Sequence, residues 1–132
     1  YGICKESGLV DFFLPKNSSH ISGSLVSQTN INLDSKIIIE VKTLADTMKE
    51  LEHKHIDILK MDIEGAEYDV IDHILNTKVS ITQLLVEFHD RFEKNGIEKT
   101  IDTVKKLKLN GFKIFAISDS FEEVSFVNER YL

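Results

Sequence analysis

The sequence has one cysteine, Cys4, and one proline, Pro15, in its 132 residues. A single cysteine excludes an internal disulfide and is typical of a protein in a reducing compartment. The longest apolar runs, such as residues 37–39 and 84–86, are far shorter than the roughly 20 residues that a helix needs to cross a bilayer. No stretch has the pattern of a secretory signal peptide. We therefore expect a cytoplasmic protein without a membrane partner.

The chain also lacks an excess of basic residues. It has 22 acidic and 16 basic residues, which gives a formal net charge of −6 at pH 7. A nucleic-acid-binding domain usually presents a basic face, so this balance argues against a nucleic-acid partner. Apolar residues make up 42% of the chain and charged residues 29%, which is ordinary for a globular protein. The length fits a single domain over residues 1–132.

Methionine is absent from the first part of the chain. The sequence begins at Tyr1, and its first methionine is Met48. We therefore expect the chain to be a piece of a longer protein.

The spacing of apolar residues predicts strands that alternate with helices. We expect strands over residues 9–14, 36–42, 55–63, 81–89, 112–118 and 122–128. Because such alternation is typical of a mainly parallel sheet with right-handed crossovers, the sequence predicts an α/β fold. The last two strands would add an antiparallel hairpin at one edge. Residues 16–35, which are rich in Ser, Asn and Gly, are predicted to form a surface loop.

Three helices are expected between these strands. Thr43 is the predicted cap of the first, with Asp46 as its capping-box partner. The second follows Gly65 and has its apolar face at residues 66, 70, 71, 74 and 75. The third is predicted to end at Gly111 and to bury a stripe formed by Ile97, Ile101, Val104 and Leu107.

The stretch ILKMDIEGAEYDVIDHIL, residues 58–75, has three acids within six residues at the end of a predicted strand. Because side chains alternate along a strand, Lys60, Asp62 and Glu64 are expected on one face. In α/β sheets, ligands bind beyond the carboxyl ends of the strands. Buried carboxylates are costly, so we expect Asp62 and Glu64 to line a cleft that is open to water. Glu67 lies in the first turn of the next helix, and we expect it only to interact favourably with the helix dipole.

The next strand repeats this arrangement with Glu87 and His89 at its end. If the two strands are neighbours, Asp62, Glu64, Glu87 and His89 converge on one cleft. Among the other histidines, only His20, in the polar loop, is a candidate for contact with a substrate. His53, His55 and His73 are expected to be solvated on the surface.

The segment LKMDIEGAEYDVI resembles the signature of FkbM-type methyltransferases, in which a strand ending in Lys-x-Asp-x-Glu-Gly-x-Glu leads into a helix. Further segments are similar to the family in the same order: ESGLVDFFLP, VKTLADTM, LLVEFH and NGFKIFAIS. Ala45 stands where the family usually has Asp. Together these segments cover nearly the whole chain.

The resemblance implies a Rossmann-like class I methyltransferase fold that uses S-adenosylmethionine (SAM). In that fold, a Gly-rich loop after the first strand and an acid at the end of the second hold SAM. The six glycines of this chain, at positions 2, 8, 23, 65, 96 and 111, form no Gly-x-Gly loop. The resemblance therefore implies the carboxyl-terminal portion of the domain, with the N-terminal strands missing and no assignable cofactor-binding residue. We expect this portion by itself to be unable to bind SAM and to be inactive. We expect an unpaired parallel sheet edge, which further residues or a second copy in a homodimer would cover.

The activity implied by the resemblance is methyl transfer from SAM to a hydroxyl of a small molecule or sugar. We expect Asp62 or His89 to act as the base and Lys60 to keep Asp62 charged. Glu64, Glu87 and His20 would contact the acceptor. In this interpretation no residue is assigned to a metal.

Two other interpretations of the same residues remain open. Asp62, Glu64, Glu87 and His89 are also a ligand set for Mg²⁺ or Mn²⁺, which would make the chain a metal-dependent enzyme. A chain without a cofactor loop could also be a non-catalytic interaction module.

Overall fold

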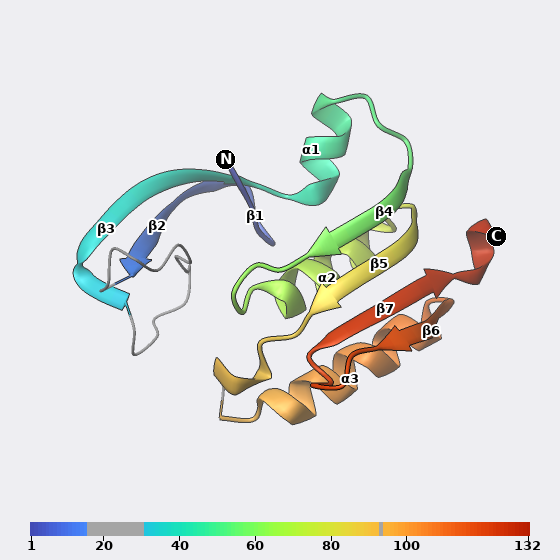
Figure 1. Cartoon of the computed structure of the whole chain (residues 1–132). Helices are drawn as coiled ribbons and strands as arrows, with labels where there is room; N and C mark the ends of the chain where they lie inside the picture. The colour runs from blue at the N-terminus through green and yellow to red at the C-terminus, as the bar shows by residue number, and fades with distance from the viewer. Residues whose placement is uncertain (16–30, 93) are drawn as a thin grey trace.

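The computed structural model describes residues 1–15, 31–92 and 94–132, which form a mixed α/β protein with two sheets (Figure 1). The first sheet has the strand order β1-β3-β2 and contains β1 (Gly2–Ile3), β2 (Gly8–Pro15) and β3 (Ile31–Lys42). The second has the order β4-β5-β7-β6 and contains β4 (Ile56–Met61), β5 (Ile81–Glu87), β6 (Phe112–Ile117) and β7 (Glu123–Asn128).

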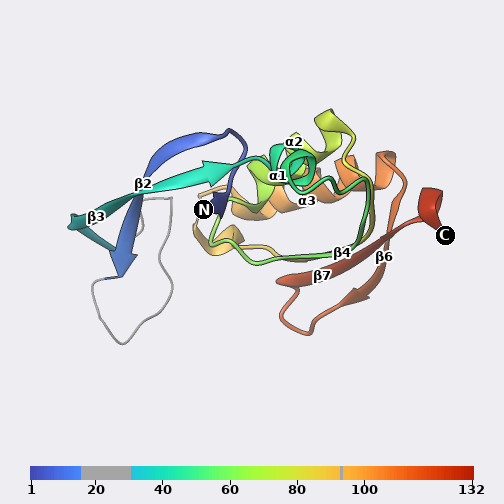
Figure 2. The same ribbon diagram turned by 90° about the horizontal axis from the view of Figure 1, so that it is seen from above.

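The helices in these ranges are α1 (Leu44–Glu50), α2 (Glu67–Thr77) and α3 (Gly96–Leu109), with two short 3-10 helices, η1 (Asp90–Phe92) and η2 (Glu129–Tyr131). None of the helices in the described part of the chain has the length and apolar character needed to span a bilayer. In Figure 2, α1, α2 and α3 lie on the same face of the four-stranded sheet.

The four-stranded sheet contains both parallel and antiparallel pairs. β4 and β5 are parallel, with Leu59 opposite Leu84, whereas β7 is antiparallel to both β5 and β6. The predicted antiparallel hairpin is confirmed, but its second strand, β7, lies inside the sheet and β6 forms the edge. A mainly parallel sheet is therefore not confirmed. The order of the last two strands depends on where β7 finds a partner, which the local pattern of apolar residues does not encode.

The predicted alternation of strands and helices is confirmed, but β3 does not join the four-stranded sheet, so the expectation of one sheet containing residues 36–42 is wrong. β3 begins at Ile31, inside the predicted loop, and pairs antiparallel with β2, with Leu9 opposite Glu40. The apolar spacing of β3 fits either sheet, and the pairing with β2 and β1 decides between them. Residues 16–30 of the predicted loop lie outside the described residues.

One edge of β4 has no strand partner within the described residues, because β4 pairs with β5 alone. The predicted unpaired parallel edge is thus present in this part of the chain. It presents backbone N–H and C=O groups that another strand can pair with.

The core lies between α2 and the four-stranded sheet. Val70, Ile71 and Ile74 of α2 are buried, as the apolar spacing predicts, and they belong to one cluster with Leu84 and Phe126 of the sheet. Each such side chain stabilises the fold by about 1.5–3 kcal/mol when fully buried. This packing fixes α2, and with it the turn between β4 and α2, on the sheet.

The first helix begins as predicted, but its cap includes an additional residue. The Thr43 hydroxyl accepts a hydrogen bond from the backbone N–H of Asp46 at 3.0 Å. The reverse half of the capping box passes through Ser7, whose hydroxyl donates to the Asp46 carboxylate and accepts from the backbone N–H of Thr43. Ser7 precedes β2, so this cap ties the three-stranded sheet to α1.

The predicted apolar stripe of α3 is only partly buried. Leu107 is fully buried, but Ile97 is 68% and Ile101 49% exposed. The first turn of α3 packs on η1 instead of the sheet, because Gly96 lies so close to the carbonyl of Asp90 that a Cβ atom would be 1.8 Å from its oxygen. This contact turns Ile97 toward solvent. The end at Gly111 is as predicted, with a left-handed φ of 93°.

Candidate functional site

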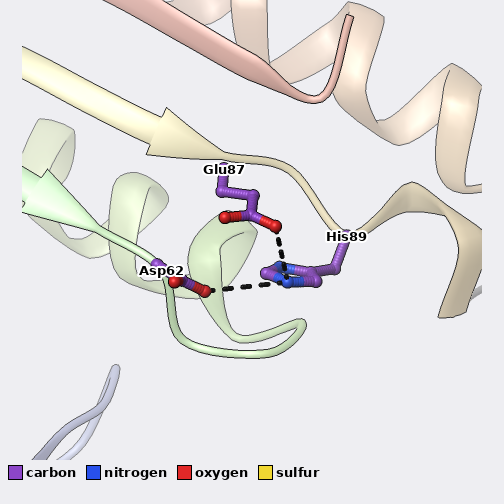
Figure 3. A group of neighbouring side chains, drawn as sticks. All are labelled: Asp62, Glu87 and His89. Atoms are coloured by element: carbon purple, nitrogen blue, oxygen red, sulfur yellow. Dashed lines mark ion pairs between the residues drawn. The ribbon is translucent and has the colours of Figure 1, made fainter. Parts of the chain in front are cut away.

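Acidic side chains and one histidine meet at the carboxyl ends of β4 and β5. Asp62 directly follows β4, Glu87 is the last residue of β5, and His89 lies two residues further on. Because β4 and β5 are parallel neighbours, their carboxyl ends lie at the same edge of the sheet. Figure 3 shows Asp62 and Glu87 pointing toward the His89 ring from these two strand ends. The predicted convergence is therefore observed.

The imidazole of His89 is at the centre of this cluster. Its Nε2 atom lies 3.7 Å from Asp62 Oδ1, 3.8 Å from Glu64 Oε2 and 3.6 Å from Glu87 Oε1. These are ion-pair distances, longer than the roughly 3.2 Å limit of an N–H···O hydrogen bond. The His89 side chain is 1% exposed, whereas that of Asp62 is 41% exposed. Three carboxylates that reach water thus surround one buried nitrogen.

Glu67 is part of this site, although its position in the first turn of α2 predicted only a helix-dipole role. Its side chain is completely buried. Its Oε1 atom accepts a 2.8 Å hydrogen bond from His89 Nδ1, and the carboxylate also accepts from the backbone N–H groups of Ile63 and Gly65. A signal was available in the sequence, because Glu67 lies at helical spacing from Val70, Ile71 and Ile74, on the buried face of α2.

The turn between β4 and α2 has an unusual backbone. Glu64 has a left-handed φ of 55° and Gly65 a φ of 103°. For a residue other than glycine, such a conformation costs on the order of 1–3 kcal/mol and persists only where the surroundings hold it. The hydrogen bonds from Ile63 and Gly65 to Glu67 hold this turn. As a result, the Glu64 carboxylate faces His89.

The buried pair of Glu67 and His89 favours the charged form of both groups. Burial acts to lower the pKa of His89, but the hydrogen bond and charge of Glu67, together with the charge of Glu64, outweigh it and raise that pKa above 6.5. Burial acts to raise the pKa of Glu67, but the hydrogen bonds from His89 and from the backbone outweigh it and lower that pKa below 4.5. The favoured state is an imidazolium that donates to a carboxylate.

We expect this pair to make stability depend on pH in both directions. The folded-state pKa of His89 is raised, so its contribution is complete below about pH 6.5 and is lost as the pH rises through the folded value. The folded-state pKa of Glu67 is lowered, so its contribution is complete above about pH 4.5 and is lost as the pH falls further. Urea unfolding followed by circular dichroism across this range measures the effect.

The matched variant for this measurement is His89→Gln, with His53→Gln at an exposed position as the control. The difference in unfolding free energy between the wild type and His89→Gln should be greatest between about pH 4.5 and about pH 6.5 and should decrease on either side of this range. A difference that stays constant with pH would contradict the assignment of the pair as charged.

The remaining predicted residues lie in different places. The Lys60 Nζ atom is 3.9 Å from Asp62 Oδ2, but its side chain is 71% exposed, so it lies at the outer margin of the cluster. His20 lies outside the described residues. His55 is exposed as predicted, and its ring nitrogens lie 2.6 Å from Ser80 Oγ and 2.8 Å from Thr82 Oγ1. The prediction of a solvated histidine is wrong for His73, whose Nε2 atom is buried.

A cavity of about 170 Å³ adjoins the acidic cluster. Asp62 and Glu64 line it on one side, and Ile3, Phe12 and Val41 of the three-stranded sheet line it on the other. The two sheets therefore enclose a partly apolar space at the carboxyl end of β4.

Together, the fold and this site define an α/β protein with an acidic site at the carboxyl ends of two parallel strands. A family model described as the methyltransferase FkbM domain matches residues 1–114. The chain therefore belongs to the FkbM methyltransferase family, in agreement with the resemblance of its central motif.

The chain is similar to the probable methyltransferase-like protein 24 of Rattus norvegicus, with 31% identity over 84 residues that cover 56% of this chain and 23% of that protein. The Homo sapiens protein of the same name is 30% identical over the same length and coverage. The uncharacterized HTH-type transcriptional regulator YvkB of Bacillus subtilis is 34% identical over 97 residues, which cover 72% of this chain and 49% of that protein. The chain thus spans about a quarter to a half of these relatives. No solved structure matches it.

Proposed function

We propose that this chain provides the acceptor side of a methyltransferase that moves a methyl group from SAM to a hydroxyl oxygen of a small molecule or sugar. One observation carries the proposal: in a chain of the FkbM family, the carboxylates of Asp62, Glu64 and Glu87 surround the buried Nε2 atom of His89. Such a cluster lies where α/β enzymes bind their ligands, beyond the carboxyl ends of parallel strands.

The acidic residues at the carboxyl ends of β4 and β5, which form one rim of the sheet, fit the reacting end of SAM. When bound, SAM supplies a methyl group on a positively charged sulfur, and carboxylates that face the site complement that charge. The Gly-x-Gly loop that holds the rest of the cofactor in the family is not in the sequence. The fit therefore concerns the reacting end only.

Asp62 is the residue that we assign to the acceptor proton. It is the most exposed of the three carboxylates around His89 and adjoins the cavity between the sheets. The Asp62 carboxylate would take the proton of the acceptor hydroxyl, whose oxygen would gain the methyl group that bound SAM supplies. His89, charged through Glu67, positions Asp62 by its Nε2 atom. Alignment of the hydroxyl with the methyl group supplies several further kcal/mol.

We further propose that the sheet β4-β5-β7-β6 belongs to a class I methyltransferase sheet. The strands that hold SAM in such a fold would pair along the edge of β4 that has no partner within the described residues. This arrangement puts the cofactor and the acidic cluster at the same rim. We also keep a cytoplasmic location as part of the proposal, in line with the free thiol of Cys4.

We do not propose a DNA-binding function, although the chain is similar to a transcriptional regulator. A net charge of −6 works against the phosphate contacts that dominate DNA affinity.

The test is a transfer assay with methyl-labelled SAM, the protein that carries this chain, and a panel of hydroxyl-bearing small molecules and sugars. The expected result is label in an O-methyl product, with transfer kept in Asp57→Asn. Asp57 is a matched control because it also lies beside a histidine, but at the start of β4, whereas Asp62 follows the end of that strand. SAM binding without transfer to any hydroxyl in the panel would contradict the acceptor class, and absence of SAM binding would contradict the activity.

A further inference from the structure

The cluster at the ends of β4 and β5 has a feature that acid–base chemistry alone does not require. Two contacts fix the orientation of the His89 ring. Its Nδ1 atom donates to the buried Glu67 carboxylate, and the ring stacks on Phe92 with centroids 5.0 Å apart. The other nitrogen, Nε2, points at carboxylates without reaching hydrogen-bond distance to any of them. A histidine oriented in this way by a carboxylate is the usual arrangement of a metal-ligating imidazole in proteins.

The separations within the cluster fit one bound ion. Two atoms that each lie about 2.2 Å from the same cation are at most about 4.4 Å apart. Nε2 of His89 is 3.7 Å from Asp62 Oδ1 and 3.6 Å from Glu87 Oε1, and all three ligand atoms lie within 4.8 Å of one another. Small rotations of the two partly exposed carboxylates would bring all three within coordination distance.

Charge also favours a cation at this point. Asp62, Glu64 and Glu87 approach one buried nitrogen, and like charges so close repel one another. Without an ion, the positive charge between them is the imidazolium of His89. A divalent cation would displace the Nε2 proton and bring one more positive charge to the same point. The Lys60 ammonium is near Asp62 alone and is mostly exposed, so water screens it.

We propose that Asp62, Glu87 and His89 bind one divalent cation, with water completing its coordination. Two carboxylate oxygens and one imidazole nitrogen form a mixed ligand set, which suits Mn²⁺ better than the oxygen-preferring Ca²⁺. Glu67 does not touch the ion in this arrangement, but it holds the His89 ring so that Nε2 faces it.

Cation binding would also narrow the class of acceptor, a consequence that rests on the proposed methyl transfer. A cation at the rim polarises a hydroxyl oxygen and eases loss of its proton. Asp62 would bind the ion through Oδ1 and take that proton through its other carboxylate oxygen. Acceptors with two adjacent oxygens, such as vicinal diols, would bind the ion through both.

The experiment is calorimetric titration of the full chain with Mn²⁺ alone. We expect saturable one-to-one binding that weakens at least ten-fold in Asp62→Asn and in Glu87→Gln. The same replacement at Asp57, which lies 3.9 Å from His55 at the start of β4, should leave the affinity unchanged. Both site variants replace partly exposed carboxylates by amides of the same shape, and circular dichroism checks that they fold.

Pulsed electron paramagnetic resonance of the Mn²⁺ complex supplies a second readout. We expect nitrogen coupling from one imidazole, which disappears in His89→Gln. The proposal is overturned if the chain shows no saturable heat up to millimolar Mn²⁺, or if Asp62→Asn and Glu87→Gln bind as tightly as the wild type.

The cation site and the proposed methyl transfer can be refuted independently of each other. Methyl transfer that persists undiminished in excess chelator would leave the proposed function standing and refute the role of the cation in it. Mn²⁺ binding without any methyl transfer would support the cation site and contradict the proposed activity.

Discussion

Replacing Glu67 by leucine is expected to lower the free energy of unfolding by about 3–5 kcal/mol, the usual cost of removing one partner from a buried ion pair. The replacement leaves His89 Nδ1 and the backbone N–H groups of Ile63 and Gly65 without the acceptor that they share. It also frees the turn that holds Glu64 in a left-handed conformation. Urea unfolding at a pH between 4.5 and 6.5, where both groups are charged, measures the loss.

Glu98→Leu is the matched control for this experiment. Glu98 lies in the first turn of α3, as Glu67 does in α2, but its side chain is exposed. Removing it costs only the interaction with the helix dipole, typically about 0.3–1 kcal/mol. A loss of this small size in Glu67→Leu would mean that the sequence-based interpretation of Glu67 was sufficient after all.

Asp62→Asn is expected to lower the kcat of methyl transfer by about 10²–10⁴-fold, the usual contribution of a positioned acid–base group. The amide keeps the shape of Asp62 but cannot take a proton, and it is a poor cation ligand. Affinity for SAM should change much less, since the chain lacks the loop that holds the cofactor in the family. Steady-state kinetics with the acceptor found in the labelling panel, together with SAM calorimetry, separates the two quantities.

Lys60→Met provides the comparison for Asp62→Asn. Lys60 is mostly exposed and 3.9 Å from Asp62, so its replacement should change kcat less than ten-fold. An Asp62→Asn enzyme that retains wild-type kcat would remove Asp62 from both the proton-transfer and the cation roles. A loss in Lys60→Met as large as that in Asp62→Asn would restore the predicted catalytic role of Lys60.

Much of the local structure could be predicted from apolar spacing. The core face of α2, the Thr43 cap and the Gly111 end of α3 follow from interactions among residues a few positions apart, and the structure confirms them. The meeting of Asp62 and Glu87 was predictable for a similar reason. Consecutive strands joined by one helix tend to be parallel neighbours, so residues at their carboxyl ends come together.

Other features could not be predicted in this way, because they depend on pairings between distant segments. β3 has the composition of a core strand, yet its partners are β1 and β2. Ile97 fits the apolar stripe of α3, yet the contact of Gly96 with Asp90 turns it to solvent. In both cases the same local pattern is compatible with more than one neighbour.

By itself, the sequence determined the family of this protein, the residues that reach the rim of the sheet, and the acidic character of the site. Only the tertiary structure decided which of these groups is buried and what it contacts. Glu67 and His89 are 22 positions apart in the chain, and their ion pair exists because α2 packs on the face of β5. The physical reason is that burial strengthens the interaction between charges and makes an unpaired charge costly, and burial is a property of packing between distant segments.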